Sequence, residues 1–99
     1  TRSGFLFIAP EEIACCTADG NYTKLLLSNG RQEVISTNLG ALEFMLQDDR
    51  FFRISRSGLI NFEYLVQVDT RKGTCRLEGE EVIELKVSRN RLVKLAALL

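Results

Sequence analysis

The chain has 99 residues, of which 45% are apolar and 26% are charged, and its formal net charge is zero. This length and composition suit one globular domain and exclude a disordered segment. No apolar run approaches the roughly 20 residues that span a bilayer, and no signal-peptide pattern opens the chain. We therefore expect a single domain over residues 1–99, and because it begins at Thr1 we expect it to be part of a longer protein.

Short strands separated by turns are predicted for the first third of the chain. Apolar runs that suit strands lie at 5–9, 13–16, 21–27 and 32–36. Pro10 stands where the first run must stop. Asn29-Gly30 joins the last two runs, and this pair predicts a hairpin because both residues tolerate positive φ.

Three cysteines lie in or near predicted strands. Adjacent Cys15 and Cys16 would point to opposite faces of a strand, so they predict neither a mutual disulfide nor a shared metal site. With Cys75 they are an odd set, and we interpret all three as buried free thiols of a cytoplasmic protein.

The middle and the end of the chain each show helical spacing. Apolar residues from Leu39 to Leu46 predict a short amphipathic helix over 38–47. Thr37 or Ser36 would provide its cap. Strands are then predicted at 51–55, 61–69, 74–78 and 81–87. A stripe of leucines and alanine predicts a final helix near 89–98, with Ser88 at its N-cap.

Residue types that carry catalysis are largely missing. The chain has no histidine, which excludes Ser–His and Cys–His pairs and histidine metal sites. Asp48-Asp49 and Glu80-Glu81 lie in predicted turns, where solvated acids are ordinary. No phosphate-cradling glycine motif is present. We expect no enzyme activity, no metal and no cofactor.

Charge is unevenly distributed despite the zero total. Residues 1–49 hold three basic and seven acidic side chains, a net charge of −4, and residues 50–99 hold ten basic and six acidic ones, a net charge of +4. A balanced total can therefore hide a basic face.

The start of the last predicted helix is positively charged, whereas the N-terminus of a helix favours negative charge. Lys86, Arg89 and Arg91 surround Ser88, although acids are preferred in a first helical turn, where cations cost about 0.3–1 kcal/mol each. An anion bound there would reverse that cost, because backbone N–H groups, a hydroxyl and guanidinium groups suit phosphate. Arginine also reads guanine in a major groove.

Two further connections carry similar polar chemistry. The residues concerned are Asn21, Tyr22, Thr23 and Lys24 in one connection, and Ser55, Arg56 and Ser57 in the other. Turn chemistry alone would favour Gly, Asn, Asp and Pro at the second. We therefore predict that three loops on a β scaffold contact DNA.

Three motifs in this order, "GNYTKLLLSNG", "FFRISRSGLIN" and "VSRNRL", resemble the LytTR DNA-binding domain of bacterial response regulators. The resemblance covers the chain from Ile13 to Leu98. It implies a mainly β, elongated sandwich of about ten short antiparallel strands in three sheets, with short helices.

The resemblance also implies a function and its residues. Loops would enter successive major grooves of double-stranded DNA, often as two copies on direct repeats, with dimerisation through a missing N-terminal domain. The DNA-binding residues that it implies are Asn21, Tyr22, Thr23, Lys24, Ser55, Arg56, Ser57, Lys86, Ser88, Arg89 and Arg91, whereas Asn61 would be structural. Ser55 and Gly58 depart from the family, which often has histidine and an aromatic residue there. These departures leave the base preference and the rigidity of the connection open.

Two other functions remain open from the sequence. A β-rich protein-interaction module would pair an exposed edge strand with a partner, but it gives no reason for cations at a helix start. RNA binding would need exposed aromatic side chains that stack on bases, and most Phe and Tyr residues here fit core faces.

Overall fold

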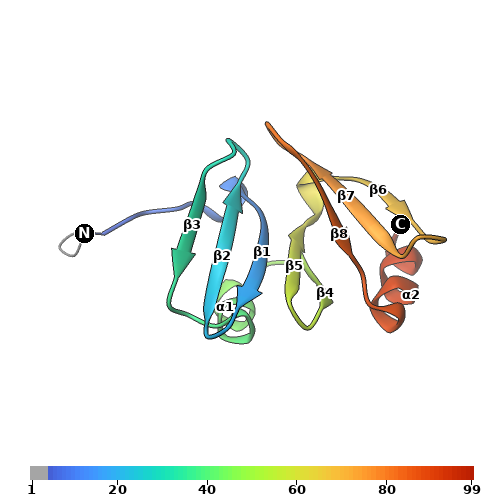
Figure 1. Ribbon diagram of the computed structural model, residues 1–99, viewed down its shortest axis with the longest axis horizontal. Coiled ribbons are helices and arrows are strands. Elements are labelled where there is room, and N and C mark those ends of the chain that lie inside the picture. The colour runs from blue at the N-terminus through green and yellow to red at the C-terminus, as the bar shows by residue number, and fades with distance from the viewer. Residues whose placement is uncertain (1–4) are drawn as a thin grey trace.

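The computed structural model describes residues 5–99, which form two antiparallel sheets and two α-helices (Figure 1). The first sheet, in the order β3-β2-β1-β5-β4, contains β1 (Ile13–Asp19), β2 (Tyr22–Leu27), β3 (Gln32–Ile35), β4 (Phe51–Ser55) and β5 (Gly58–Asn61). The second sheet, in the order β6-β7-β8, contains β6 (Leu65–Asp69), β7 (Thr74–Glu78) and β8 (Val82–Lys86). The helices are α1 (Leu39–Leu46) and α2 (Arg89–Leu98). No helix in the described part is long and apolar enough to cross a membrane.

The mainly β class with two helices is confirmed, but the strand and sheet numbers differ from the expectation. Residues 5–99 hold eight strands in two sheets instead of about ten strands in three. Residues 5–9 are not a strand, because they pair with no neighbour, and Phe5 and Phe7 are 92% and 90% exposed. The predicted strand 61–69 is broken by a 3-10 turn at Phe62–Tyr64.

Asn61 causes that break and has the structural role that the resemblance implied. Its side chain is fully buried, and Oδ1 accepts a hydrogen bond from the Glu63 backbone N–H at 2.8 Å. Its Nδ2 donates to the Ile13 carbonyl oxygen at 2.9 Å. A buried amide that satisfies two strand ends in this way stabilises the turn from β5 into β6.

Helix α1 begins one residue later than predicted and has a different cap. The Oδ1 atom of Asn38, not Thr37 or Ser36, accepts a hydrogen bond from the Ala41 N–H at 2.9 Å. The helix ends at Gln47, which has a left-handed backbone with φ 38°. Leu39 and Leu42 face the core, whereas Met45 is exposed, so the predicted apolar stripe is only partly buried.

The first sheet forms a middle layer with a core on each face. One core holds Cys16, Leu25, Leu59 and the buried leucines of α1. The other lies between the sheets and holds Cys15, Ile54, Ile60, Cys75, Leu77 and Leu95. Cys15 and Cys16 thus point to opposite faces, as strand alternation predicts. All three cysteines are free and buried.

The three buried thiols make the domain less stable as the pH rises above 9. Burial raises the pKa of Cys15 and Cys75 to about 11 and that of Cys16 to about 12, with a smaller contribution from a neighbouring thiol or carboxylate. Between pH 9 and 11 the unfolded thiols lose protons that the folded ones keep. We expect the free energy of unfolding to fall there by up to about 1.4 kcal/mol per pH unit for each thiol. Urea denaturation across this range measures how the free energy of unfolding falls with pH. A variant with alanine at all three cysteine positions should show a smaller fall.

Gly79 joins the two sheets at the edge opposite the predicted DNA-binding loops. A Cβ atom there would lie 2.7 Å from the Ser28 carbonyl oxygen, and Glu80 N donates to the same oxygen at 2.8 Å. We expect Gly79→Ala to lower the free energy of unfolding by about 1–3 kcal/mol, because the clash is with backbone. Gly40→Ala in α1 is the matched control and should raise it by about 0.5–1 kcal/mol. A neutral Gly79→Ala in urea denaturation would contradict the reasoning.

Candidate nucleic-acid interface

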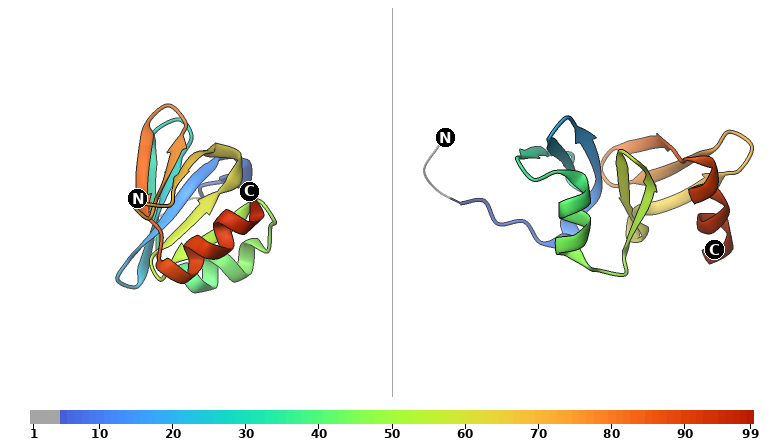
Figure 2. Two further views of the ribbon diagram at one scale, coloured as in Figure 1. Left: turned by 90° about the vertical axis from the view of Figure 1, so that its right-hand side faces the viewer. Right: turned by 90° about the horizontal axis from the view of Figure 1, so that it is seen from below.

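Three connections lie along one long edge of the molecule, the lower edge in Figure 1. They are the β1–β2 turn, the β4–β5 turn and the segment from β8 into α2, with the β4–β5 turn in the middle. The right-hand view of Figure 2 looks onto this edge and shows the β4–β5 hairpin between the two helices. The molecule measures 46 × 26 × 22 Å, so these connections are spread along its longest dimension. We call this the loop edge.

Backbone hydrogen bonds fix the three connections relative to one another. The Ala18 N–H, at the end of β1, donates to the Ser57 carbonyl oxygen at 2.9 Å. The Ser88 N–H, at the start of α2, donates to the Ile54 carbonyl oxygen at 2.9 Å. The loop edge is therefore a preformed surface whose parts belong to different elements.

Arg53 stabilises the β4–β5 turn from within. Its Nε donates to the Ser55 carbonyl oxygen at 2.7 Å and its Nη2 to the Arg56 carbonyl oxygen at 2.6 Å. Its Nη1 pairs with the Glu43 carboxylate at 2.7 Å. This explains why two arginines occur so close together: the Arg53 side chain satisfies turn carbonyls, which leaves Arg56 to face outward.

Arg56 is exposed on the loop edge and is not neutralised. Within residues 5–99 no carboxylate lies within 4 Å of its guanidinium group. It lines a surface depression of about 680 Å³ together with Ser55, Ser57, Ser88 and Asn90. The Ser57 N–H donates to Ser55 Oγ at 3.2 Å, which closes the turn.

Arg89 and Lys86 lie on a second, more basic depression at the start of α2. It has a volume of about 310 Å³, and Arg71 and Lys72 from the β6–β7 turn line its other side. Of these four cations, only Lys72 approaches a carboxylate within the described chain, that of Glu84 at 3.5 Å. No sequence motif pointed to Arg71 and Lys72, which lie between the predicted strands 61–69 and 74–78.

Ser88 and Arg91 have partly structural roles. Ser88 is at the N-cap position, but its hydroxyl makes no capping bond and lies 3.2 Å from the Ile54 carbonyl oxygen. Arg91 Nε donates to the Arg53 carbonyl oxygen at 2.8 Å, and its guanidinium carbon lies 4.7 Å from the centre of the Phe52 ring. This cation–π contact holds Arg91 against β4.

Of the four DNA-binding residues predicted in the β1–β2 connection, three have side chains that reach the surface. Asn21 and Tyr22 are exposed, with Tyr22 at 54%, and Lys24 is half-buried on the same side of β2 as Tyr22. The predicted DNA contact by Thr23 does not fit the structure. Its side chain is fully buried, and Oγ1 donates to the Thr37 carbonyl oxygen at 2.7 Å. Alternation along β2 turns it inward, so it cannot present its hydroxyl to a ligand.

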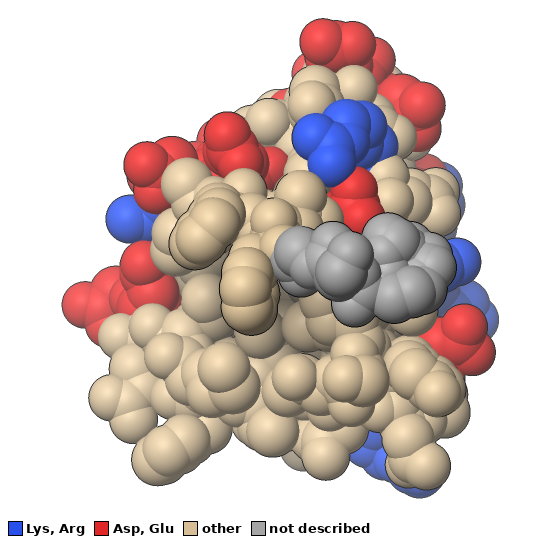
Figure 3. Space-filling model, turned by 90° about the vertical axis from the view of Figure 1, so that its left-hand side faces the viewer, with Lys and Arg blue, Asp and Glu red and all other residues tan. Residues whose placement is uncertain are grey.

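The edge opposite the loop edge is acidic. The β7–β8 turn carries exposed Glu80 and Glu81, and it lies at the upper edge in Figure 1 beside the β2–β3 turn. Figure 3 shows acidic side chains mainly along the upper and left margins, with basic side chains among them, and a largely uncharged lower part.

The family follows from a comparison with sequence models. The model of the LytTR DNA-binding domain matches residues 3–99. The chain belongs to this family. A solved LytTR DNA-binding domain, from a putative methyl-accepting/DNA response regulator of Bacillus cereus, has the same fold: the TM-score is 0.76 at 19% identity, covering 99% of this chain and 90% of that one. The curated proteins give no match. A DNA-binding family fits the expectation of binding without catalysis.

Gly58 of this LytTR domain packs closely against the β4–β5 turn, and the structure gives a reason for glycine there. Gly58 is buried at the start of β5, and a Cβ atom there would lie 2.9 Å from Ile54 Cγ1 and 3.3 Å from Ser55 Oγ. It therefore permits close packing at the turn, and its φ is not positive.

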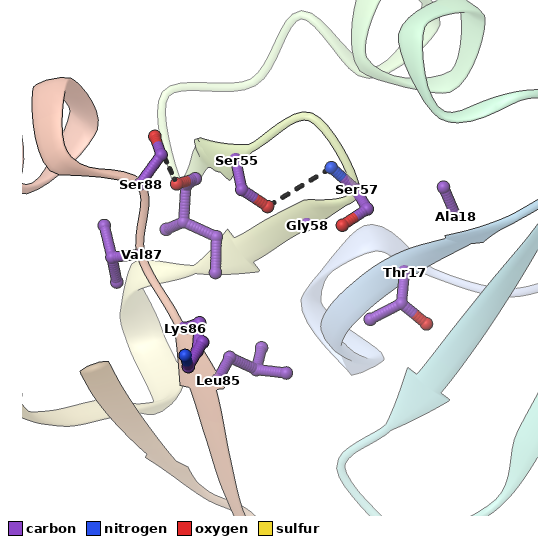
Figure 4. Close-up of a pocket in the computed structure, with 10 residues that line it drawn as sticks. Thr17, Ala18, Ser55, Ser57, Gly58, Leu85, Lys86, Val87 and Ser88 are labelled. Atoms are coloured by element: carbon purple, nitrogen blue, oxygen red, sulfur yellow. Dashed lines mark hydrogen bonds between the residues drawn. The ribbon is translucent and has the colours of Figure 1, made fainter. Parts of the chain in front are cut away.

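A hollow lies beside Gly58, between the two sheets. It has a volume of about 400 Å³ and opens between the β4–β5 turn and the strand that leads into α2 (Figure 4). Its lining includes Thr17 and Ala18 on one side and Leu85 and Lys86 on the other.

Proposed function

We propose that this LytTR domain binds double-stranded DNA sequence-specifically to regulate transcription, as the output domain of a cytoplasmic response regulator. The observation that carries the proposal is the pair Arg56 and Arg89. Both are exposed, neither is neutralised within residues 5–99, and both belong to the loop edge. Guanidinium groups held without an internal partner suit phosphate oxygens and guanine edges.

The shape supports contacts in more than one groove. The β1–β2 turn and the start of α2 lie apart along the longest axis of the molecule, whose 46 Å extent includes the extended segment before β1 (Figure 1). In the proposed complex the long axis of the domain follows the duplex. The β1–β2 turn and the start of α2 then enter successive major grooves, with the β4–β5 turn between them. Two copies would bind direct repeats and dimerise through an N-terminal domain of the longer protein.

The contacts divide by chemistry. Backbone phosphate is favoured at one depression because four cations surround it and, within residues 5–99, only Lys72 pairs with an acid; the four are Lys86, Arg89, Arg71 and Lys72. Arg56 has polar neighbours, Ser55 and Ser88, which suit a base edge. In the β1–β2 turn, Asn21, Tyr22 and Lys24 provide the third set of contacts.

Salt dependence tests the proposal directly. If about five phosphates are neutralised, the logarithm of the binding constant should fall with the logarithm of salt concentration with a slope near −4.5. Fluorescence anisotropy of a duplex recovered from a random library, measured between 50 and 200 mM salt, gives this slope. A slope near zero, or no selection of any duplex, would contradict DNA binding.

A protein-interaction module is the second candidate, and one surface favours it. Val34 on β3, an edge strand, and Phe44 and Met45 on α1 are 60%, 72% and 68% exposed. Both elements lie at the left end of Figure 1, away from α2. Binding through this end would depend little on salt and would survive the loss of Arg56 and Arg89.

A further inference from the structure

Asn90 shares the middle of the loop edge with Arg56, although the sequence motifs gave it no role. It is the second residue of α2 and is exposed. It lines two neighbouring depressions, of about 680 and 380 Å³, and both also contain Ser55, Arg56 and Ser88. An amide from the start of a helix and a guanidinium from a strand turn thus face the same space.

The amide of Asn90 is oriented by the protein and only partly used by it. Its Oδ1 lies 3.0 Å from Ser88 Oγ, the nearer of the two acceptors for that hydroxyl proton. An amide oxygen accepts two hydrogen bonds and the NH2 group donates two. Within residues 5–99 Nδ2 has no partner, so one acceptor position and both donors remain free. This leaves the donor–acceptor pair that matches adenine N7 and N6.

The charges around this space favour a base edge over a phosphate at Asn90. Glu43 and Arg53 also line the smaller depression, and they form an ion pair with each other at 2.7 Å. Arg91 is held against Phe52 and donates to a carbonyl oxygen. Arg56 is the cation left free there, whereas the depression at Lys86 and Arg89 holds four cations.

We propose that Asn90 reads an adenine in the major groove, in the base pair next to the one that Arg56 contacts. This inference rests on the proposed function, because it assumes that the loop edge faces DNA. Ser88 is then a positioning residue: its hydroxyl fixes the amide so that Nδ2 meets adenine N7 and Oδ1 accepts from N6. The domain would prefer adenine at one position of its site because of one side chain.

Selection from a random duplex library tests the assignment. The wild-type domain and Asn90→Ala are each used to select binding sequences, with Gln67→Ala, an exposed amide on β6, as the matched control. We expect Asn90→Ala to lose the preference for adenine at one position only and to bind the wild-type sequence about 5- to 150-fold more weakly. Gln67→Ala should keep both the adenine preference and the affinity for the wild-type sequence. An unchanged preference in Asn90→Ala overturns the assignment.

A modified base gives a second measurement that needs no altered protein. 7-Deazaadenine lacks the N7 acceptor, and it is placed at each adenine of the selected duplex in turn. The wild-type domain should lose about 5- to 10-fold in affinity at one adenine, and Asn90→Ala should lose nothing further there. Equal losses for both proteins overturn the inference and leave DNA binding intact. Failure of the wild-type domain to select any sequence overturns the proposed function itself.

Discussion

Replacement of both Arg56 and Arg89 by alanine is expected to weaken binding to the selected duplex by 100-fold or more. A bidentate base contact, which we expect of Arg56, contributes about 1–3 kcal/mol, and a hydrogen bond between charged groups, which we expect between Arg89 and phosphate, contributes about 1.5–3 kcal/mol. The two side chains lie on different depressions and share no lining residue, so their effects should add. Both are exposed and make no ion pair within residues 5–99, so the free energy of unfolding should hardly change. Anisotropy titrations of the single and double variants measure the loss.

The same titrations separate base contacts from phosphate contacts. A base contact is lost on the selected duplex only, whereas a phosphate contact is lost equally on any duplex and makes the salt slope less negative by about 1. We expect the first behaviour for Arg56 and the second for Arg89, because of the cations around it. Arg31→Ala, whose side chain pairs with Glu33 in the first sheet, is the control. Tight, selective binding by the double variant would refute the placement of DNA on the loop edge.

Arg53→Met is expected to impair both folding and DNA binding, although Arg53 is turned inward. The substitution keeps an apolar stem but removes the donors to the Ser55 and Arg56 carbonyl oxygens and the ion pair with Glu43. Hydrogen bonds from a charged donor are worth about 1.5–3 kcal/mol, so the free energy of unfolding should fall by about 2–3 kcal/mol. Binding should weaken about tenfold, because Arg56 is no longer held outward.

Glu43→Gln is the matched control for that experiment. It removes the charge that pairs with Arg53 and leaves both carbonyl contacts of the turn in place. We expect a change below about 1 kcal/mol, since the pair is partly exposed. Urea denaturation and anisotropy on the two variants give the comparison. If Arg53→Met and Glu43→Gln are equally stable and bind DNA equally well, the hydrogen bonds from Arg53 do not stabilise the β4–β5 turn.

The parts of the fold that could be predicted have clear local signals. The strand 51–55 and the helix 89–98 have the predicted bounds, because alternation in one and leucine spacing in the other are complete. The strand 61–69 was wrong because Asn61 turns the chain through side-chain hydrogen bonds. The predicted strand at 5–9 was wrong because a short apolar run forms a strand only beside another strand, and in residues 5–99 none pairs with it.

The candidate site shows the same limit at the level of single residues. The sequence marked the three connections, but it could not tell which arginine would be used internally. The side chains of Arg53 and Arg91 donate to backbone carbonyl oxygens, whereas within residues 5–99 the Arg56 side chain has no such bond. Only the folded structure distinguishes them. Arg71 and Lys72 were missed because they come from a turn more than a dozen residues before α2, and only strand pairing brings them beside Arg89.

The placement of Glu80 and Glu81 on the edge opposite the loop edge has a consequence for how the domain approaches a polyanion. A domain of zero net charge gains little long-range attraction, so it should spend little time on unrelated sequences. With these two acids on one edge and Arg56 and Arg89 on the other, we expect the field of a duplex to turn the domain before contact. Encounters would then be few but correctly oriented, and raising the net charge without regard to position should increase indiscriminate association more than selective association.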